Sequence, residues 1–110
     1  MKFSPDDKVV GTRIGLVAEN SDVRQIFIDF AGPKLSAIPS TNAPVAVVTC
    51  STNAQIVANQ VVWNPFDKAW RAVLKMQPNP GNSAPVDLRC TLERTNHVVS
   101  ETWAYQWTAP

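Results

Sequence analysis

Apolar and polar residues alternate with a period of two along seven separate stretches of the chain, as in β-strands with one buried face. The stretches are residues 9–15, 23–30, 44–50, 56–63, 69–76, 86–93 and 98–107. The alternation is clearest in 86–93, where Val86, Leu88, Cys90 and Leu92 share one face. No window repeats apolar residues at helical spacing over three turns, so we expect almost no helix.

Two segments depart from simple alternation. Residues 44–50 are almost continuously apolar, which predicts a strand that is covered on both faces. Residues 33–44 contain Pro33, Pro39 and Pro44 and are expected to form a long crossover between two sheets. Short polar pairs such as Thr95-Asn96 instead predict tight hairpins.

Composition supports an all-β domain. The chain has 110 residues, the size of a single domain, and its nine prolines against four glycines favour many short strands. About seven antiparallel strands in this length predict an immunoglobulin-like two-sheet sandwich, with a small barrel as the alternative. Cys50 ends the third stretch rather than the second, and Leu88 stands where an antibody domain has its corner tyrosine. We therefore expect the architecture without the antibody-type disulfide.

The net charge and the lengths of the apolar stretches limit the kinds of partner to be expected. The net charge of +1 provides no positive field, so we do not expect nucleic acid as a partner. No apolar stretch reaches the length of a membrane span, and no apolar run follows Lys2, so the sequence shows no secretory signal peptide.

Side chains for catalysis or metal binding are sparse. Cys50, Cys90 and the single His97 cannot supply the four grouped ligands of a zinc site. The cysteines are candidates for a disulfide, and two buried thiols are the alternative. Paired carboxylates for glycoside hydrolysis could be drawn from Asp29, Glu93 and Glu101, but their positions favour solvated charges. We expect no catalytic residue, no metal and no cofactor.

Aromatic residues offer the alternative function. Trp63, Phe66 and Trp70 flank the turn at Asn64-Pro65, and Trp103, Tyr105 and Trp107 share one face of the last stretch. Exposed flat rings could stack on sugars, whereas alternate aromatics in a sandwich normally fill its core. We expect Trp70 and Trp103 in the core and Trp107 partly exposed. The candidates for contact with glucan or with another domain are Trp63, Phe66 and Trp107.

Five motifs in a fixed order carry a family resemblance. They are TRIG at 12–15, QIFIDFAG at 25–32 followed by Lys34-Leu35, NP at 64–65 followed by AWR at 69–71, PVDLR at 85–89 and SETWAYQ at 100–106. Together they resemble the C-terminal part of the periplasmic glucan biosynthesis protein G/D family. Two positions depart from its pattern, because Pro33 and Ala69 stand where the family usually has glycine.

The resemblance implies a second, immunoglobulin-like domain at residues 9–110, with residues 1–8 as the remnant of a connector. In that family a larger N-terminal β-sandwich handles the glucan and carries the catalytic carboxylates, so no catalytic residue transfers to this chain. The parent would be periplasmic and would act in the synthesis of osmoregulated periplasmic glucans, which are branched β-linked glucose polymers. An oxidising periplasm would also favour a Cys50–Cys90 bridge.

The function expected from the resemblance is that of a non-catalytic accessory domain. Its expected partners are the N-terminal β-sandwich domain, the membrane glucosyltransferase and β-glucan. The alternative is a carbohydrate-binding module that grips β-glucan through exposed aromatics. An independent enzyme is the third hypothesis, and too few suitable residues support it.

Overall fold

Alternate burial along three central strands builds the core of the protein. A computed structural model describes residues 8–16 and 22–108. In strand β2 (Arg24–Ala31), strand β5 (Ala69–Pro78) and strand β6 (Val86–Arg94), every second side chain is buried. The fully buried members of these rows include Ile26, Ile28, Phe30, Trp70, Ala72, Leu74, Met76, Val86, Leu88, Cys90 and Leu92. These rows are the faces that the sequence pattern predicts as inward.

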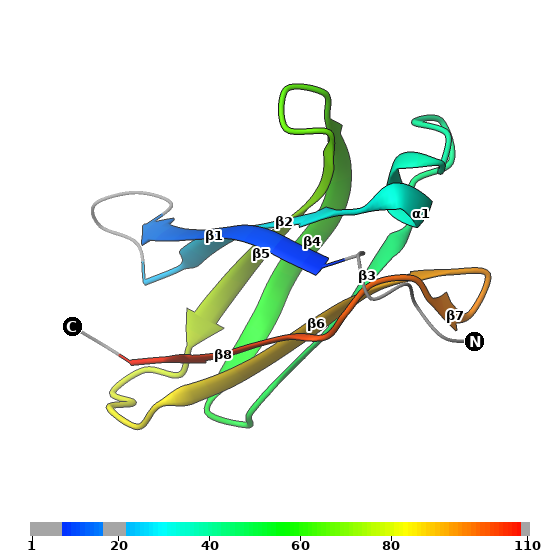
Figure 1. The fold of residues 1–110 in the computed structure, drawn as a ribbon. Coiled ribbons are helices and arrows are strands. Elements are labelled where there is room, and N and C mark those ends of the chain that lie inside the picture. Colours follow the sequence, from blue (N-terminus) through cyan, green and yellow to red (C-terminus); the bar gives the residue numbers. More distant parts are fainter. Residues whose placement is uncertain (1–7, 17–21, 109–110) are drawn as a thin grey trace.

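The remaining elements complete two antiparallel sheets (Figure 1). They are β1 (Lys8–Leu16), α1 (Pro33–Ser36), β3 (Val45–Cys50), β4 (Ala54–Asn64), β7 (His97–Val98) and β8 (Trp103–Trp107). The first sheet has the order β1-β2-β5-β4, and the second has β3-β6-β7 with β8 also paired to β6. Since β7 and β8 pair with successive parts of β6, they act as one interrupted edge strand. The strand order is that of an immunoglobulin-type sandwich, which confirms the predicted fold class.

Three local expectations differ from the structure. Residues 44–50 were expected to be covered on both faces, but Val45 is 61% and Val47 is 41% exposed, because these alternate side chains of β3 lie on the side away from the core, where no described element covers them. The expected single strand at 98–107 is divided into β7 and β8 around Ser100. The crossover at 33–44 contains one short helix, α1, that starts at Pro33, where a fixed φ suits the first helical position.

A buried indole joins the crossover to the sheet. Trp70 lies at the start of β5 with 1% of its surface exposed, and its Nε1 donates to the backbone oxygen of Leu35 at 2.9 Å. Leu35 is itself 1% exposed and is the buried residue of α1. This contact fixes the crossover over the end of the core. The predicted hairpin at Thr95-Asn96 is also present, with φ of 54° and 64° at these two residues.

The other end strands are held together by polar contacts across the sheets. The Nε1 of Trp103 in β8 donates to Oγ1 of Thr12 in β1 at 3.0 Å. The backbone N–H of Val9 donates to Oε1 of Glu101 at 2.6 Å. These two bonds join β1, an edge strand of the first sheet, to residues 101–103 at the edge of the second sheet. They close this side of the sandwich. No helix in residues 8–16 and 22–108 is long and apolar enough to cross a bilayer.

Ser100 explains why the last strand is interrupted. Its side chain is fully buried, and its Oγ accepts from the N–H of Leu92 at 2.9 Å and donates to the carbonyl of Glu101 at 2.9 Å. The hydroxyl therefore supplies a hydrogen bond to β6 between the two segments in which β7 and β8 supply backbone bonds.

We expect Ser100→Ala to lower the free energy of unfolding by about 1–3 kcal/mol, because the buried Leu92 N–H loses this acceptor. Urea unfolding followed by far-UV circular dichroism measures the change. The same substitution at exposed Ser83 is the control and should leave the midpoint unchanged. Equal midpoints for the two variants would contradict the role assigned to the Ser100 hydroxyl.

Candidate functional site

The turn between β4 and β5 presents Phe66 to solvent. Phe66 is 94% exposed. The turn is held by Asn64, whose Oδ1 accepts from the Phe66 N–H at 3.2 Å and whose Nδ2 donates to Oδ2 of Asp67 at 3.0 Å. Lys68 completes the turn with a φ of 50°. The aromatic ring therefore projects from an ordered turn, which lowers the entropic cost of using it as a contact.

Trp63 is only partly available beside this turn. Its ring packs edge to face on Trp70, with 5.2 Å between the ring centroids and 61° between the planes. Trp63 is half-buried, whereas Trp70 lies in the core as predicted. The edge-to-face contact of such a pair stabilises the end of the sheet, in addition to the stabilisation that comes from the buried apolar area. Trp63 thus supports the turn that carries Phe66.

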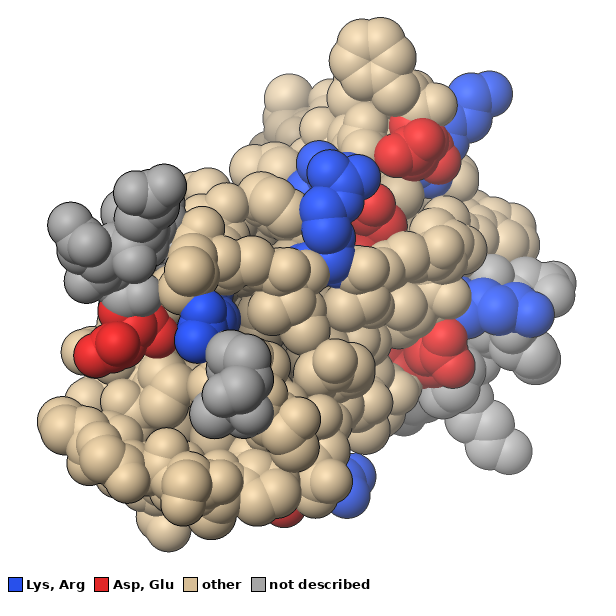
Figure 2. Space-filling view, turned by 90° about the vertical axis from the view of Figure 1, so that its left-hand side faces the viewer, with Lys and Arg blue, Asp and Glu red and all other residues tan. Residues whose placement is uncertain are grey.

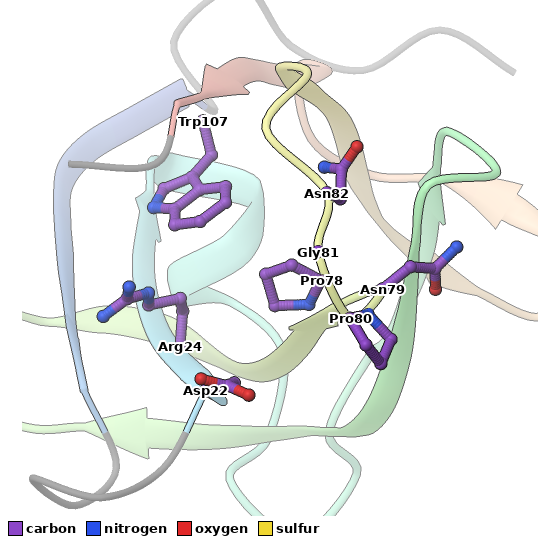
Figure 3. Close-up of a pocket in the computed structure, with 8 residues that line it drawn as sticks. All are labelled: Asp22, Arg24, Pro78, Asn79, Pro80, Gly81, Asn82 and Trp107. Atoms are coloured by element: carbon purple, nitrogen blue, oxygen red, sulfur yellow. The ribbon is translucent and has the colours of Figure 1, made fainter.

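Trp107 lies at the opposite end of the sandwich and is buried. The sequence predicted partial exposure, but 7% of Trp107 is exposed, because the guanidinium of Arg24 covers its ring at 5.2 Å from the centroid. A pocket of about 160 Å³ opens beside it, as Figure 3 shows. Its lining residues are Asp22, Arg24, Pro78, Asn79, Pro80, Gly81, Asn82 and Trp107. Within the described chain, the Nε of Arg24 is buried without a hydrogen-bond partner.

The three contact candidates do not form one surface. Trp63 pairs with Trp70 near the start of β5, whereas Arg24, which covers Trp107, pairs with Met76 near the end of β5. Trp63 and Phe66 thus share one end of the sandwich and Trp107 lies at the other. Trp103 is in the core as predicted, and Tyr105, which stacks on it at 5.7 Å, is 43% exposed.

An ion pair on the outer face of the first sheet was not anticipated from the sequence. The Nε and Nη2 of Arg71 donate to the two carboxylate oxygens of Asp29 at 2.8 and 3.0 Å. The same guanidinium lies 5.2 Å from the ring centroid of Phe27. The hydrogen bond to Asp29 is the main cause that raises the pKa of Arg71. The sequence does contain a sign of this ion pair, because Asp29 and Arg71 both occupy outward positions of predicted strands.

Charges on the surface are mixed in sign. On the face that Figure 2 shows, basic and acidic side chains lie side by side and form no patch of a single sign. Within residues 8–16 and 22–108, no three His, Cys, Asp or Glu side chains are grouped as metal ligands. Two of the three carboxylates considered for hydrolysis have other contacts, since Asp29 binds Arg71 and Glu101 binds the Val9 N–H.

The two cysteines face the core from neighbouring strands. They are not bridged in this structure, and the register pairs Cys50 with Leu88 and Cys90 with Val48, so they are diagonal neighbours. Diagonal Cα atoms in a sheet lie about 7–8 Å apart, whereas a disulfide needs less than about 7 Å. Burial raises the pKa of Cys50, and it raises that of Cys90 to about 12. The bridge remains a prediction, and this geometry favours two thiols.

Comparison with known proteins assigns the family. The family model described as "Periplasmic glucan biosynthesis protein, MdoG" matches residues 2–107. The chain belongs to this family. Glucans biosynthesis protein G of Serratia proteamaculans is 32% identical over 91 residues, which are 83% of this chain and 17% of the relative.

Two further relatives give the same picture. The protein of the same name from Pseudomonas aeruginosa is 33% identical over 101 residues, covering 84% of this chain and 19% of the relative. That of Dickeya dadantii is 32% identical over 92 residues, covering 83% and 17%. The chain therefore spans less than a fifth of the length of these curated relatives.

Residues of the family motifs have structural contacts in this member of the family. Thr12 accepts from Trp103, and Asp29 binds Arg71. Trp70 and Ser100 each bind a backbone group of a distant segment. The motifs that identify the glucan biosynthesis family therefore coincide with the bonds that join strands, sheets and crossover.

Cys90 should make the stability of this domain depend on alkaline pH. Its folded-state pKa of about 12 lies above the ordinary value of 9.0. Above pH 9 the unfolded thiol ionises while the folded one does not, so protons favour the folded state and stability falls as the pH rises. We expect the free energy of unfolding, relative to Cys90→Ala, to fall by at most about 1.4 kcal/mol per pH unit between these values.

Denaturant unfolding in reductant across this pH range measures the difference. The two proteins differ only at position 90, so the difference between their profiles belongs to the Cys90 side chain. Parallel pH profiles for the two proteins would contradict a buried, protonated Cys90.

Proposed function

We propose that the chain is a non-catalytic accessory domain of a longer periplasmic protein that is needed for glucan synthesis. One observation carries the proposal: the family model matches residues 2–107, yet the chain spans less than a fifth of its relatives. A piece of this size, with its own core, acts beside the larger remainder of such a protein. The name of the family supports both the periplasmic location and the role in glucan biosynthesis.

In this proposal the domain packs on the larger glucan-handling domain through the end of the sandwich that carries Phe66. Lys8, the first residue of β1, pairs with Ala31, and the register continues through Phe30 and Trp70 towards the turn after Asn64. A connector at residues 1–8, of which 1–7 lie outside the described residues, would lead to this end. The ordered, exposed Phe66 is a suitable anchor for a neighbouring domain.

The membrane glucosyltransferase is a further proposed partner, and glucan itself would be bound by the larger domain. Support for a non-catalytic role comes from the carboxylates. Of the three carboxylates considered for hydrolysis, Asp29 and Glu101 accept hydrogen bonds from other groups of the fold. A general acid and base for glycoside hydrolysis would instead face a shared substrate site.

A domain replacement tests the accessory role. In a strain that lacks the Pseudomonas aeruginosa relative, we expect a copy without the region matched by this chain to abolish periplasmic glucan, and a copy with this chain grafted there to restore it. A graft with Phe66→Ser should restore less glucan, whereas one with Leu16→Ser, exposed at the opposite end of β1, should restore as much as the unchanged graft.

Immunoblots of the periplasm control for loss of the protein. Normal glucan from the truncated copy would refute the accessory role. Release or transfer of glucosyl units from β-1,2-glucan by this chain alone would refute the non-catalytic role.

A carbohydrate-binding module is the second candidate, and the pocket beside Trp107 is the observation that favours it. An indole, two prolines and planar polar side chains surround the pocket, and the unpartnered Nε of Arg24 could donate to a sugar hydroxyl (Figure 3). Sugar sites combine such apolar and polar groups. The low exposure of Trp107 leaves only a small area for stacking.

If this candidate holds, β-glucan at millimolar concentration should shift the tryptophan emission of the chain, and Arg24→Ala should abolish the shift. Trp63→Phe at the opposite end should keep it. A fluorescence titration measures both. No shift at millimolar glucan would remove this candidate and leave the accessory role untouched.

A further inference from the structure

One side of the sandwich is built from the longest uncharged run of the chain. Residues 35–66 contain no Asp, Glu, Lys, Arg or His. They form the second half of α1 together with β3, β4 and the start of the next turn, and β3 and β4 lie in contact as edge strands of different sheets (Figure 1). Five of the eight exposed large hydrophobic side chains of the described residues belong to this run, namely Val45, Val47, Val57, Val62 and Phe66.

Edge strands normally carry features that prevent pairing with another chain, such as charges, proline, bulges or short length. In this fold, β1 has Lys8, Arg13 and a bulge between Val9 and Gly11. β3 has six residues and follows Pro44, and β8 has five residues. Three of the edge segments are therefore protected.

β4 lacks this protection over most of its length. It is the longest strand, with eleven residues, and contains neither charge nor proline. Its bulge lies near its start, between Ile56 and Ala58, so residues 58–64 run regularly along β5. In the sheet order β1-β2-β5-β4, no strand of residues 8–16 and 22–108 pairs with the other edge of this segment. Such a long, uncharged and regular edge is a template for another strand.

We propose that this edge pairs with the same edge of a second copy of the chain. Two β4 strands would run antiparallel about a two-fold axis near Val61 and join two four-stranded sheets into one. Gln60 of each copy would then face Val62 of the other on the outer side, and Val61 would face its own counterpart on the inner side. Uncharged and β-branched pairs of this kind stabilise neighbouring strands.

Charge favours a second copy as the occupant. A self-pairing surface meets the same residues on its partner, so any charge near the axis would face a like charge. Pairing through β1 would bring Lys8 and Arg13 of both copies together, whereas residues 58–64 bring no charge. Two β4 edges can therefore pair without bringing like charges together. A partner recognised through charge would need opposite charges here, and the run provides none.

Sedimentation of the purified chain tests the proposal. We expect the average mass to rise from 12.1 kDa towards twice that value as the concentration increases from micromolar towards millimolar. The double variants Gln60→Lys/Val62→Lys and Gln60→Glu/Val62→Glu should each weaken dimerisation about tenfold or more, because like charges would face each other across the axis. An equal mixture of the two should recover the dimer through opposite charges.

Val10→Lys is the matched control, since Val10 is 60% exposed on β1, the other edge of the same sheet, and should leave the dimer intact. Circular dichroism checks that every variant is folded. The proposal is overturned if the chain stays monomeric at all concentrations, if the lysine double variant dimerises like the unchanged chain, or if Val10→Lys dissociates it equally. In the first case the same β4 variants are placed in the full-length parent protein. If they lower the stability of that protein while the isolated chain is monomeric, the β4 edge pairs with another part of the parent and not with a second copy.

Discussion

The fold depends on the burial of one side of β2, β5 and β6. Each buried aliphatic side chain of these rows contributes about 1.5–3 kcal/mol, and the rows face each other across the two sheets. Because successive side chains of a strand point to opposite faces, the choice of the buried residues also determines which residues lie on the outer face of each sheet. Arg71 follows Trp70 and must point outwards, where it meets Asp29 of β2. The surface of the domain is thus a direct consequence of its core.

This dependence explains what could be predicted from the sequence. Alternation is a local property, so it predicts correctly the strands and inward rows of residues 23–30, 69–76 and 86–93, and with them the place of Trp70. Exposure of Val45 and burial of Trp107 depend on which strand lies beside which, and that order is set by tertiary packing. A continuous apolar run looks the same on an edge as in the middle of a sheet. The contact of the Arg24 guanidinium with the Trp107 ring joins residues 83 positions apart, so a local sequence pattern cannot predict it.

The candidate site was predictable only in its parts. Phe66 follows Asn64-Pro65 in a turn, and a turn between two strands exposes its central residues, so its exposure follows from the sequence. That Trp63 supports this turn, and that Trp107 lies at the far end, required the register. The motif residues show the same limit. Their order along the chain identifies the family, but only the fold shows that Thr12 and Trp103 bind each other.

The two lateral sides of the sandwich differ in a way that bears on its use. On one side, the hydrogen bonds from Trp103 to Thr12 and from Val9 to Glu101 close the gap between the sheets, and Lys8 and Arg13 lie along β1. On the other, β3 and β4 meet without a charged residue, and β4 offers a regular, unprotected edge. Low overall charge alone would distribute neutral residues over the whole surface. Their concentration in one continuous run instead gives the domain one side suited to water and one suited to a neighbouring strand.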